Sequence, residues 1–192
     1  MPYNYSELRC YIIIGMKKGL VFIAVCLFIV PEIKAQKSTG KVKWYTFEEA
    51  VKLVQKEPRK LFIDVYTDWC GWCKRMDENT FSHPVIAEYL NTHFYAVKFN
   101  AESTDPVKFG GKTYINEGNG NRHSHQLAIL LLQGRMSYPS VVYMNEDLQL
   151  LTAVAGYMEP KAMEPILNYI ATDKYKTVEW NEFQKNFPSS IQ

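Results

Sequence analysis

The stretch IDVYTDWCGWCK, residues 63–74, decides how the rest of this sequence is interpreted. It begins within a mostly apolar run, residues 61–66, which predicts a short buried strand. A polar turn follows, and residues 70 to about 81 predict a helix. Two cysteines, Cys70 and Cys73, therefore lie at the junction of a strand and a helix.

A cysteine pair at this position favours thiol chemistry. Two cysteines separated by two residues can close a small disulfide ring. The free N–H groups and partial positive charge at a helix N-terminus favour the thiolate form of Cys70. Cys73 lies one turn further along the helix, where it is placed to attack a mixed disulfide formed by Cys70.

Other interpretations of the pair stay open. The two thiols could form half of a zinc site, but such a site needs four ligands, and only His123 and His125 could complete it. The pair could also be a permanent structural disulfide or two buried thiols. We expect no metal and no organic cofactor.

The pattern of the chain predicts one α/β domain. A capping box at Thr46 and Glu49 starts a helix that ends before Pro58, and another helix starts near Pro84. Strands and helices in the order βαβ and then ββα predict a mixed sheet with helices on both faces. The other predicted elements are strands at 94–99, 141–144 and 150–155, and helices at 127–132, around 163–170 and around 180–187.

Residues 63–74 resemble the active-site strand, turn and helix of the thioredoxin superfamily. Trp69 before the first cysteine, Gly71 after it and Lys74 after the second all match the family pattern. Trp72 departs from it, since thioredoxin itself has Pro at this place.

The resemblance extends over nearly all of residues 41–172. The tripeptide YPS, residues 138–140, resembles the cis-proline segment, and Gly156 falls where a second substrate-loop glycine is expected. The chain is similar to secreted bacterial thioredoxin-like proteins that carry an insertion. This implies a thioredoxin fold, a central mixed β-sheet flanked by helices, with a loop insertion at 101–125 after the central strand and a short C-terminal helical extension at 174–192.

The resemblance also assigns supporting roles around the cysteines. Asp64 lies six residues before Cys70 on the buried strand, where burial raises the pKa of a carboxyl group and suits it to proton transfer. The family has a buried Asp at this place that is thought to deprotonate the second cysteine, Cys73, and Lys98 matches a lysine that neighbours it. The alternatives are an ordinary strand-end Asp and a solvated lysine.

Substrate contacts are implied on both sides of the pair. The resemblance implies a cis Pro139, which disfavours metal capture and exposes the backbone of Tyr138 for pairing with an extended substrate. Trp69, Trp72, Tyr138 and Tyr66 are expected to surround Cys70 with an apolar rim, although packing in the core is an alternative for each. The full predicted substrate-binding set is Trp69, Gly71, Trp72, Tyr138, Pro139 and Gly156. Residues 119–125 are interpreted as a plain surface loop, with partner recognition as the alternative.

Residues 1–35 predict a secretory signal peptide. Lys17 and Lys18 precede an apolar run of eleven residues, 20–30, about half of the ~20 residues that span a bilayer. A retained N-terminal membrane anchor is the alternative.

Cleavage is expected between Ala35 and Gln36, and a start at Met16 would give a signal of normal length. The full chain of 192 residues has a net charge of +2, and loss of the signal removes four basic and two acidic residues. The mature domain, 36–192, is therefore formally neutral, which gives no reason to expect a nucleic acid partner.

A content of 47% hydrophobic residues argues against disorder.

Together these features predict a periplasmic thiol–disulfide oxidoreductase, most simply a disulfide reductase that acts through the Cys70–Cys73 couple. The expected partners are proteins that bear disulfides and a membrane electron donor, and the protein is expected to be a monomer. The rival functions are a disulfide oxidase or isomerase, and a non-catalytic chaperone or adaptor that binds extended segments.

Overall fold

A five-stranded mixed sheet forms the centre of the fold in the computed structural model, which describes residues 40–118 and 122–192. The strand order is β1-β3-β2-β6-β7, with β1 and β2 parallel to β3, and with β6 antiparallel to both β2 and β7. This arrangement confirms the predicted fold class. The strands are β1 (Trp44–Tyr45), β2 (Lys60–Tyr66), β3 (Phe94–Asn100), β6 (Ser140–Met144) and β7 (Leu150–Ala155).

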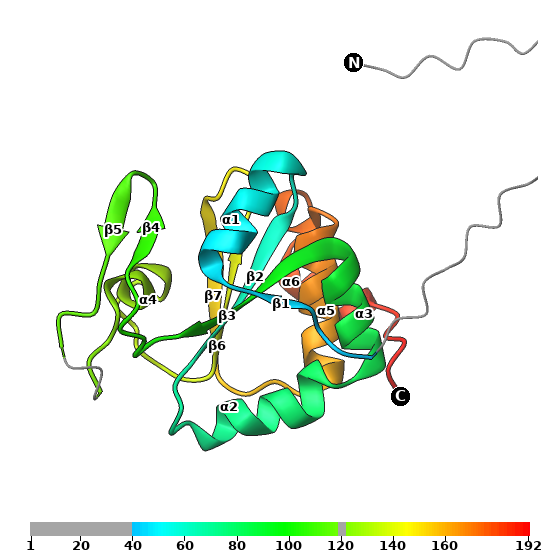
Figure 1. Cartoon of the computed structure of the whole chain (residues 1–192). Helices are drawn as coiled ribbons and strands as arrows, with labels where there is room; N and C mark the ends of the chain where they lie inside the picture. Colours follow the sequence, from blue (N-terminus) through cyan, green and yellow to red (C-terminus); the bar gives the residue numbers. More distant parts are fainter. Residues whose placement is uncertain (1–39, 119–121) are drawn as a thin grey trace, which may run out of the picture. The chain divides into compact units, whose positions relative to one another are not determined.

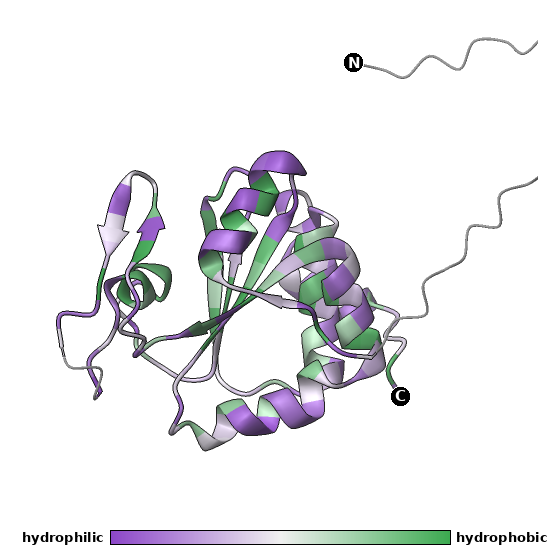
Figure 2. Ribbon diagram, in the orientation of Figure 1, coloured by the Kyte–Doolittle hydropathy of each residue, from purple (hydrophilic) through white to green (hydrophobic). Residues whose placement is uncertain are grey.

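Helices cover both faces of the sheet (Figure 1). One face packs against α1 and α4, and the other packs against α2, α3 and α5. Figure 2 shows mostly apolar central strands, and it shows α1 as a mixture of polar and apolar residues. The helices are α1 (Phe47–Lys56), α2 (Gly71–Met76), α3 (Pro84–His93), α4 (Gln126–Leu131) and α5 (Pro160–Ala171).

Local sequence signals determine where the first helix begins. Thr46 Oγ1 accepts a hydrogen bond from Glu49 N at 3.3 Å, and Glu49 Oε2 accepts one from Thr46 N at 2.9 Å. This is the predicted capping box, and it satisfies two backbone donors at the start of α1.

The register of β2 and β3 brings two site residues together. Asp64 pairs with Lys98 across the parallel strands, and with Val141 on the other side. Successive side chains on a strand point to opposite faces, so paired positions in two adjacent strands share a face. Asp64 and Lys98 therefore share one face of the sheet.

The predicted helix at residues 70–81 consists of α2 followed by a π-helical turn, Asp77–Phe81. The wider turn changes the direction in which side chains leave the helix. Asp77 is its first residue, and its carboxylate reaches Lys98 on β3.

Residues 101–125, the predicted insertion, contain a small hairpin of their own. Strands β4 (Val107–Phe109) and β5 (Lys112–Tyr114) pair antiparallel, and they stand apart from the central sheet in Figure 1. The base of the insertion is tied to the core where Ala101 N donates to Tyr66 O at 2.8 Å and His125 N donates to Ala101 O at 2.7 Å.

The interpretation of residues 119–125 as a plain surface loop is wrong at His125, and residues 119–121 lie outside the described residues. The His125 ring is buried. Its Nδ1 accepts a hydrogen bond from Leu127 N at 3.0 Å, which caps α4, and its Nε2 lies 3.1 Å from Asp105 O. Both ring nitrogens are therefore used, one by the start of α4 and one by Asp105, and His125 does not complete a zinc site with the cysteines.

Residues 174–192, the predicted C-terminal extension, pack back on the rest of the domain. They contain a 3₁₀ turn, Lys174–Lys176, and a short helix α6, Trp180–Asn186. The ring of Tyr169 on α5 contacts the rings of Trp180 and Phe183, with centroids 5.2 and 4.9 Å apart.

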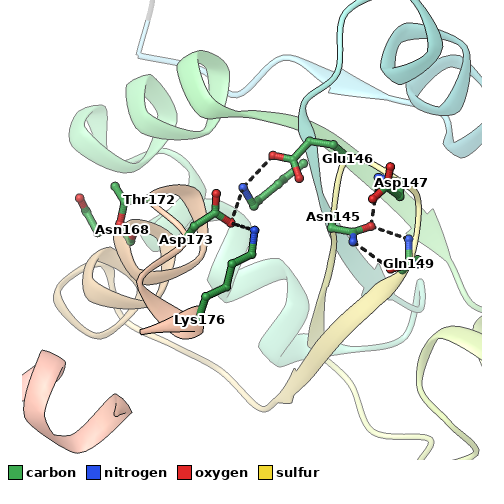
Figure 3. A network of polar contacts seen from close by, with 9 residues as sticks. Asn145, Glu146, Asp147, Gln149, Asn168, Thr172, Asp173 and Lys176 are labelled. Carbon is green, nitrogen blue, oxygen red and sulfur yellow. Dashed lines mark hydrogen bonds and ion pairs between the residues drawn. The ribbon is translucent and has the colours of Figure 1, made fainter. Parts of the chain in front are cut away.

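A charged network joins this extension to the sheet. The buried Lys60 Nζ lies 2.7 Å from Glu146 Oε1 and 3.1 Å from Asp173 Oδ1, and Asp173 also pairs with Lys176 (Figure 3). The predicted signal peptide, residues 1–35, lies outside the described residues. Within the described part of the chain, no helix is long and apolar enough to span a bilayer.

Candidate active site

The two cysteines form a disulfide at the start of α2. Cys70 is the N-cap of this helix, and its Sγ accepts a hydrogen bond from Cys73 N at 3.1 Å. A donor N–H aimed at the sulfur, together with the helix dipole, stabilises negative charge on Cys70 once the disulfide is reduced. Both side chains are nearly enclosed.

A buried carboxylate lies on the strand that leads to Cys70. Asp64 is 1% exposed, and burial raises its pKa to about 6. Asp64 Oδ2 forms an ion pair of 2.7 Å with Lys98 Nζ, which acts to lower this pKa. An acid that titrates near neutral pH can both accept and return a proton, so Asp64 is suited to proton transfer.

The ammonium group of Lys98 contacts a second carboxylate and three aromatic rings in addition to Asp64. Its Nζ contacts the carboxylate of Asp77, and it lies over the rings of Trp44, Tyr66 and Phe81 at 5.0 to 5.3 Å from their centroids. Burial acts to lower the pKa of Lys98, but the two carboxylates outweigh it and raise the pKa. The two carboxylates therefore favour the charged form of Lys98.

The loop before β6 lies close to the end of β7. The Tyr138–Pro139 peptide bond is cis, and Gly156 N donates to Pro139 O at 2.8 Å. Gly156 has a φ of +100°, a conformation that side chains disfavour, which explains a glycine at this place.

Two exposed tryptophans lie next to the cysteines in sequence, Trp69 before Cys70 and Trp72 between Cys70 and Cys73. The side chain of Trp69 is 59% exposed, and its ring meets that of Tyr138 edge to face with centroids 6.0 Å apart. Trp72 is equally exposed and packs against Tyr157 at 5.3 Å. Tyr66 lies over Lys98, within the charged cluster.

Three residues of this region are absent from the sequence-based prediction. Asp77 lies four residues after Cys73, a helical spacing that could have suggested it. Tyr157 directly follows Gly156. Glu102, whose Oε1 accepts a hydrogen bond from Trp69 Nε1 at 3.0 Å, has no local signal because it belongs to the insertion.

Comparison with known proteins places this arrangement in a family. The family described as "Thioredoxin-like domain" matches residues 47–171, and the chain belongs to it. It is thus a member of a thioredoxin-like family, and its Cys-X-X-Cys pair is closed as a disulfide.

Individual relatives are distant. Spermatogenesis-associated protein 20 of Rattus norvegicus is 32% identical over 81 residues, 42% of this chain and 10% of the relative. An uncharacterized protein of Caenorhabditis elegans is 22% identical over 148 residues, 77% of this chain and 18% of the relative. This chain thus spans less than a fifth of either relative. The solution structure of a thioredoxin from Thermus thermophilus aligns with a TM-score of 0.51 and 16% identity, covering 68% of this chain and 87% of the thioredoxin, which shows a shared fold.

Proposed function

We propose that this protein is a thiol–disulfide oxidoreductase that reduces disulfides of extracytoplasmic proteins through the Cys70–Cys73 couple. The observation that carries the proposal is a disulfide at a helix N-terminus, preceded on the adjoining strand by a buried carboxyl group whose pKa is about 6. Neither a structural disulfide nor a pair of inert thiols needs such a proton-transfer group.

The reaction is an exchange of two electrons. The Cys70 thiolate attacks one sulfur of the substrate disulfide, and the other sulfur leaves as a thiolate that takes up a proton. Cys73 then loses its proton and attacks the Cys70 sulfur, which closes the Cys70–Cys73 disulfide and releases the second substrate sulfur as a thiol. The dithiol loses one proton to solvent when the Cys70 thiolate forms and the second from Cys73, and it gives up two electrons. The substrate disulfide gains the two electrons and takes up two protons, one of them from solvent.

Asp64 serves the second step in this proposal. Its carboxylate accepts the Cys73 proton, directly or through water, and a charged Lys98 keeps a useful fraction of Asp64 ionised at neutral pH. Substrate is held across Trp69, Gly71 and Trp72 on one side and across Tyr138, Pro139 and Gly156 on the other. An extended substrate pairs with the backbone of Tyr138.

The direction of exchange depends on the reduction potential. Potentials in this class of proteins run from about −270 mV for thioredoxin to about −120 mV for a strong oxidant. The Asp64–Lys98 pair favours the reducing end, whereas Trp72 in place of Pro shifts the couple somewhat toward the oxidising end.

The cellular setting is part of the proposal. Residues 1–35 direct export to the periplasm, cleavage before Gln36 yields the domain 36–192, and a membrane electron donor reduces the protein again. The domain acts as a monomer, residues 101–125 are its insertion, and residues 174–192 are its C-terminal extension.

The test is the reduction potential of the Cys70–Cys73 couple in the purified protein, measured by equilibration with dithiothreitol and glutathione buffers. A value near or below about −240 mV supports a reductase. A value above about −180 mV contradicts it and favours an oxidase or isomerase. A pair that never exchanges points to a structural disulfide or an adaptor.

Two variants separate catalysis from simple binding. Cys73→Ser is expected to trap mixed disulfides on Cys70, because the resolving thiol is gone. Cys70→Ser is expected to lose turnover. Client binding that Cys70→Ser leaves unchanged, in a protein whose wild type shows no turnover, would identify an adaptor.

A further inference from the structure

A pocket with a volume of about 310 Å³ opens beside Trp69, the residue that precedes Cys70. Three segments far apart in sequence form it: the active-site turn, the loop that holds the cis proline, and the insertion. Its lining residues are Trp69, Glu102, Arg122, Ser124, Met136 and Tyr138.

Hydrogen bonds and ring contacts hold the walls of this pocket in place. Trp69 Nε1 donates to Glu102 Oε1 at 3.0 Å, and the Trp69 ring meets Tyr138 edge to face. Glu102 is itself fixed, since its N donates to Asn100 Oδ1 at 2.9 Å and its carbonyl accepts from Asn116 Nδ2 at 3.2 Å. The hydrogen bond to Glu102 therefore fixes the orientation of the exposed Trp69 ring. The walls of the pocket are in place without a ligand.

The walls determine what chemistry the pocket suits. Trp69, Tyr138 and Met136 offer an indole, a phenol ring and a thioether, all good partners for apolar groups. Glu102 and Arg122 carry opposite charges, so together they give no preference for a cation or an anion. The volume is large enough for one aromatic side chain.

The position of the pocket determines which part of a substrate would reach it. An extended segment paired with the backbone of Tyr138 lies beside the disulfide, and its side chains point alternately to opposite faces. A residue directly before or after the substrate cysteine then lies only about 3.3 Å along the chain from it.

We propose that this pocket is a specificity subsite for an aromatic side chain close to the substrate cysteine, with Glu102 as the positioning residue that holds Trp69. The inference rests on the proposed function and deepens it. It assigns a role in substrate choice to the insertion, whose Glu102, Arg122 and Ser124 form half of the pocket.

The test uses four disulfide-bonded peptides, identical except that Phe or Ser stands directly before or directly after the cysteine. The rate of reduction by the reduced protein is measured for each. We expect the Phe peptide to react about tenfold faster than its Ser counterpart at one of the two positions, a difference within the range by which apolar pockets discriminate. Equal rates for Phe and Ser at both positions would overturn the inference.

Variants of the lining residues test whether the preference for Phe over Ser arises in this pocket. Met136→Ser and Glu102→Ala are expected to reduce the Phe-to-Ser rate ratio to about one, and Glu102→Gln to preserve it because an amide oxygen still accepts from Trp69 Nε1. Ile129→Ser is the matched control, since Ile129 is an exposed apolar residue that does not line the pocket. A ratio that survives Met136→Ser and Glu102→Ala, or that Glu102→Gln abolishes, would overturn the proposal.

Two further outcomes separate this inference from the proposed function. A wild-type protein that exchanges with dithiothreitol but shows no Phe preference contradicts only the subsite. A wild-type protein that exchanges with neither dithiothreitol nor any peptide contradicts the proposed function itself. A dimer that dissociates in Met136→Ser would place a second copy in the pocket, and would also overturn the inference.

Discussion

Lys98 contacts two carboxylates at once, with its Nζ 2.7 Å from Asp64 Oδ2 and in contact with the carboxylate of Asp77. The two acids differ in their surroundings, because Asp64 is 1% exposed and the side chain of Asp77 is 43% exposed. Their effects on the buried acid are opposite, since Lys98 lowers the pKa of Asp64 and Asp77 raises it. The three residues form one charged cluster around the carboxyl group of Asp64, so substitutions in it should change the pKa of Asp64 in predictable directions.

Replacing Asp64 with Asn should slow the resolving step. The amide cannot accept the Cys73 proton, and a general base contributes roughly 100-fold or more. We therefore expect release of substrate thiol from a preformed mixed disulfide to slow by about 100-fold at pH 7, as measured in a single turnover. Asp147→Asn, in the exposed β6–β7 turn, is the control and should leave the rate unchanged. An Asp64→Asn variant as fast as wild type would show that Asp64 moves no proton.

The same buried acid should make the folded protein less stable as the pH rises. Its folded pKa of about 6 lies above the ordinary value of 3.8, so the folded state binds more protons between these values. Stability from this group is therefore present below pH 4 and is lost as the pH rises to 6. The rise of the pKa from 3.8 to about 6 corresponds to about 3 kcal/mol.

Denaturant unfolding of the oxidised protein and of Asp64→Asn at several pH values measures this effect. Asn has no such titration, so the variant should gain stability relative to wild type by up to about 3 kcal/mol between pH 4 and pH 7. A stability difference that stays constant over this range would contradict the raised pKa.

Lys98→Met should shift the pH profile of the resolving step toward higher pH. The substitution keeps an unbranched apolar side chain but removes the charge that lowers the pKa of Asp64. More of Asp64 is then protonated at neutral pH, and the base form appears only at higher pH. The rate of thiol release, measured from pH 5 to pH 9, reports this shift. An unchanged pH profile would show that Lys98 does not influence the proton transfer.

Asp77→Asn should shift the same profile in the opposite direction. Removal of its negative charge lowers the pKa of Asp64, because Asp77 acts to raise it and shares the ammonium group of Lys98. The effect should be smaller than that of Lys98→Met, since Asp77 is partly solvated and its charge is screened. If the pH profiles of Lys98→Met and Asp77→Asn shifted in the same direction, the proposed opposite effects of these two residues on the pKa of Asp64 would be contradicted.

Much of this fold could be predicted because its signals are local. The capping box at Thr46 and the apolar strand at residues 61–66 are set by neighbouring residues, and they appear as expected. The cysteine motif and the YPS tripeptide at residues 138–140 identify the fold by resemblance, and the family match supports that fold.

The rest depends on contacts between distant residues. The hydrogen bond between Trp69 and Glu102 joins residues 33 positions apart, and no local sequence pattern predicts it. The spacing of Asp77 from Cys73 is helical, but the π turn that begins at Asp77, where its carboxylate contacts Lys98, has no signal in the sequence. His125 looks like a polar loop residue, yet hydrogen bonds at both of its ring nitrogens offset the cost of burying it.

Lys60→Met should weaken the whole domain, because Lys60 joins the start of β2 to two distant segments. Its buried Nζ pairs with Glu146 in the β6–β7 turn and with Asp173 after α5 (Figure 3). Hydrogen bonds to charged groups contribute about 1.5–3 kcal/mol, and both carboxylates stay partly solvated when the lysine is lost. We expect the free energy of unfolding to fall by about 2 kcal/mol in denaturant titrations. Lys174→Met, at an exposed lysine in the same segment, should change it by less than about 0.5 kcal/mol. Equal losses in the two variants would show that the network does not join the extension to the sheet.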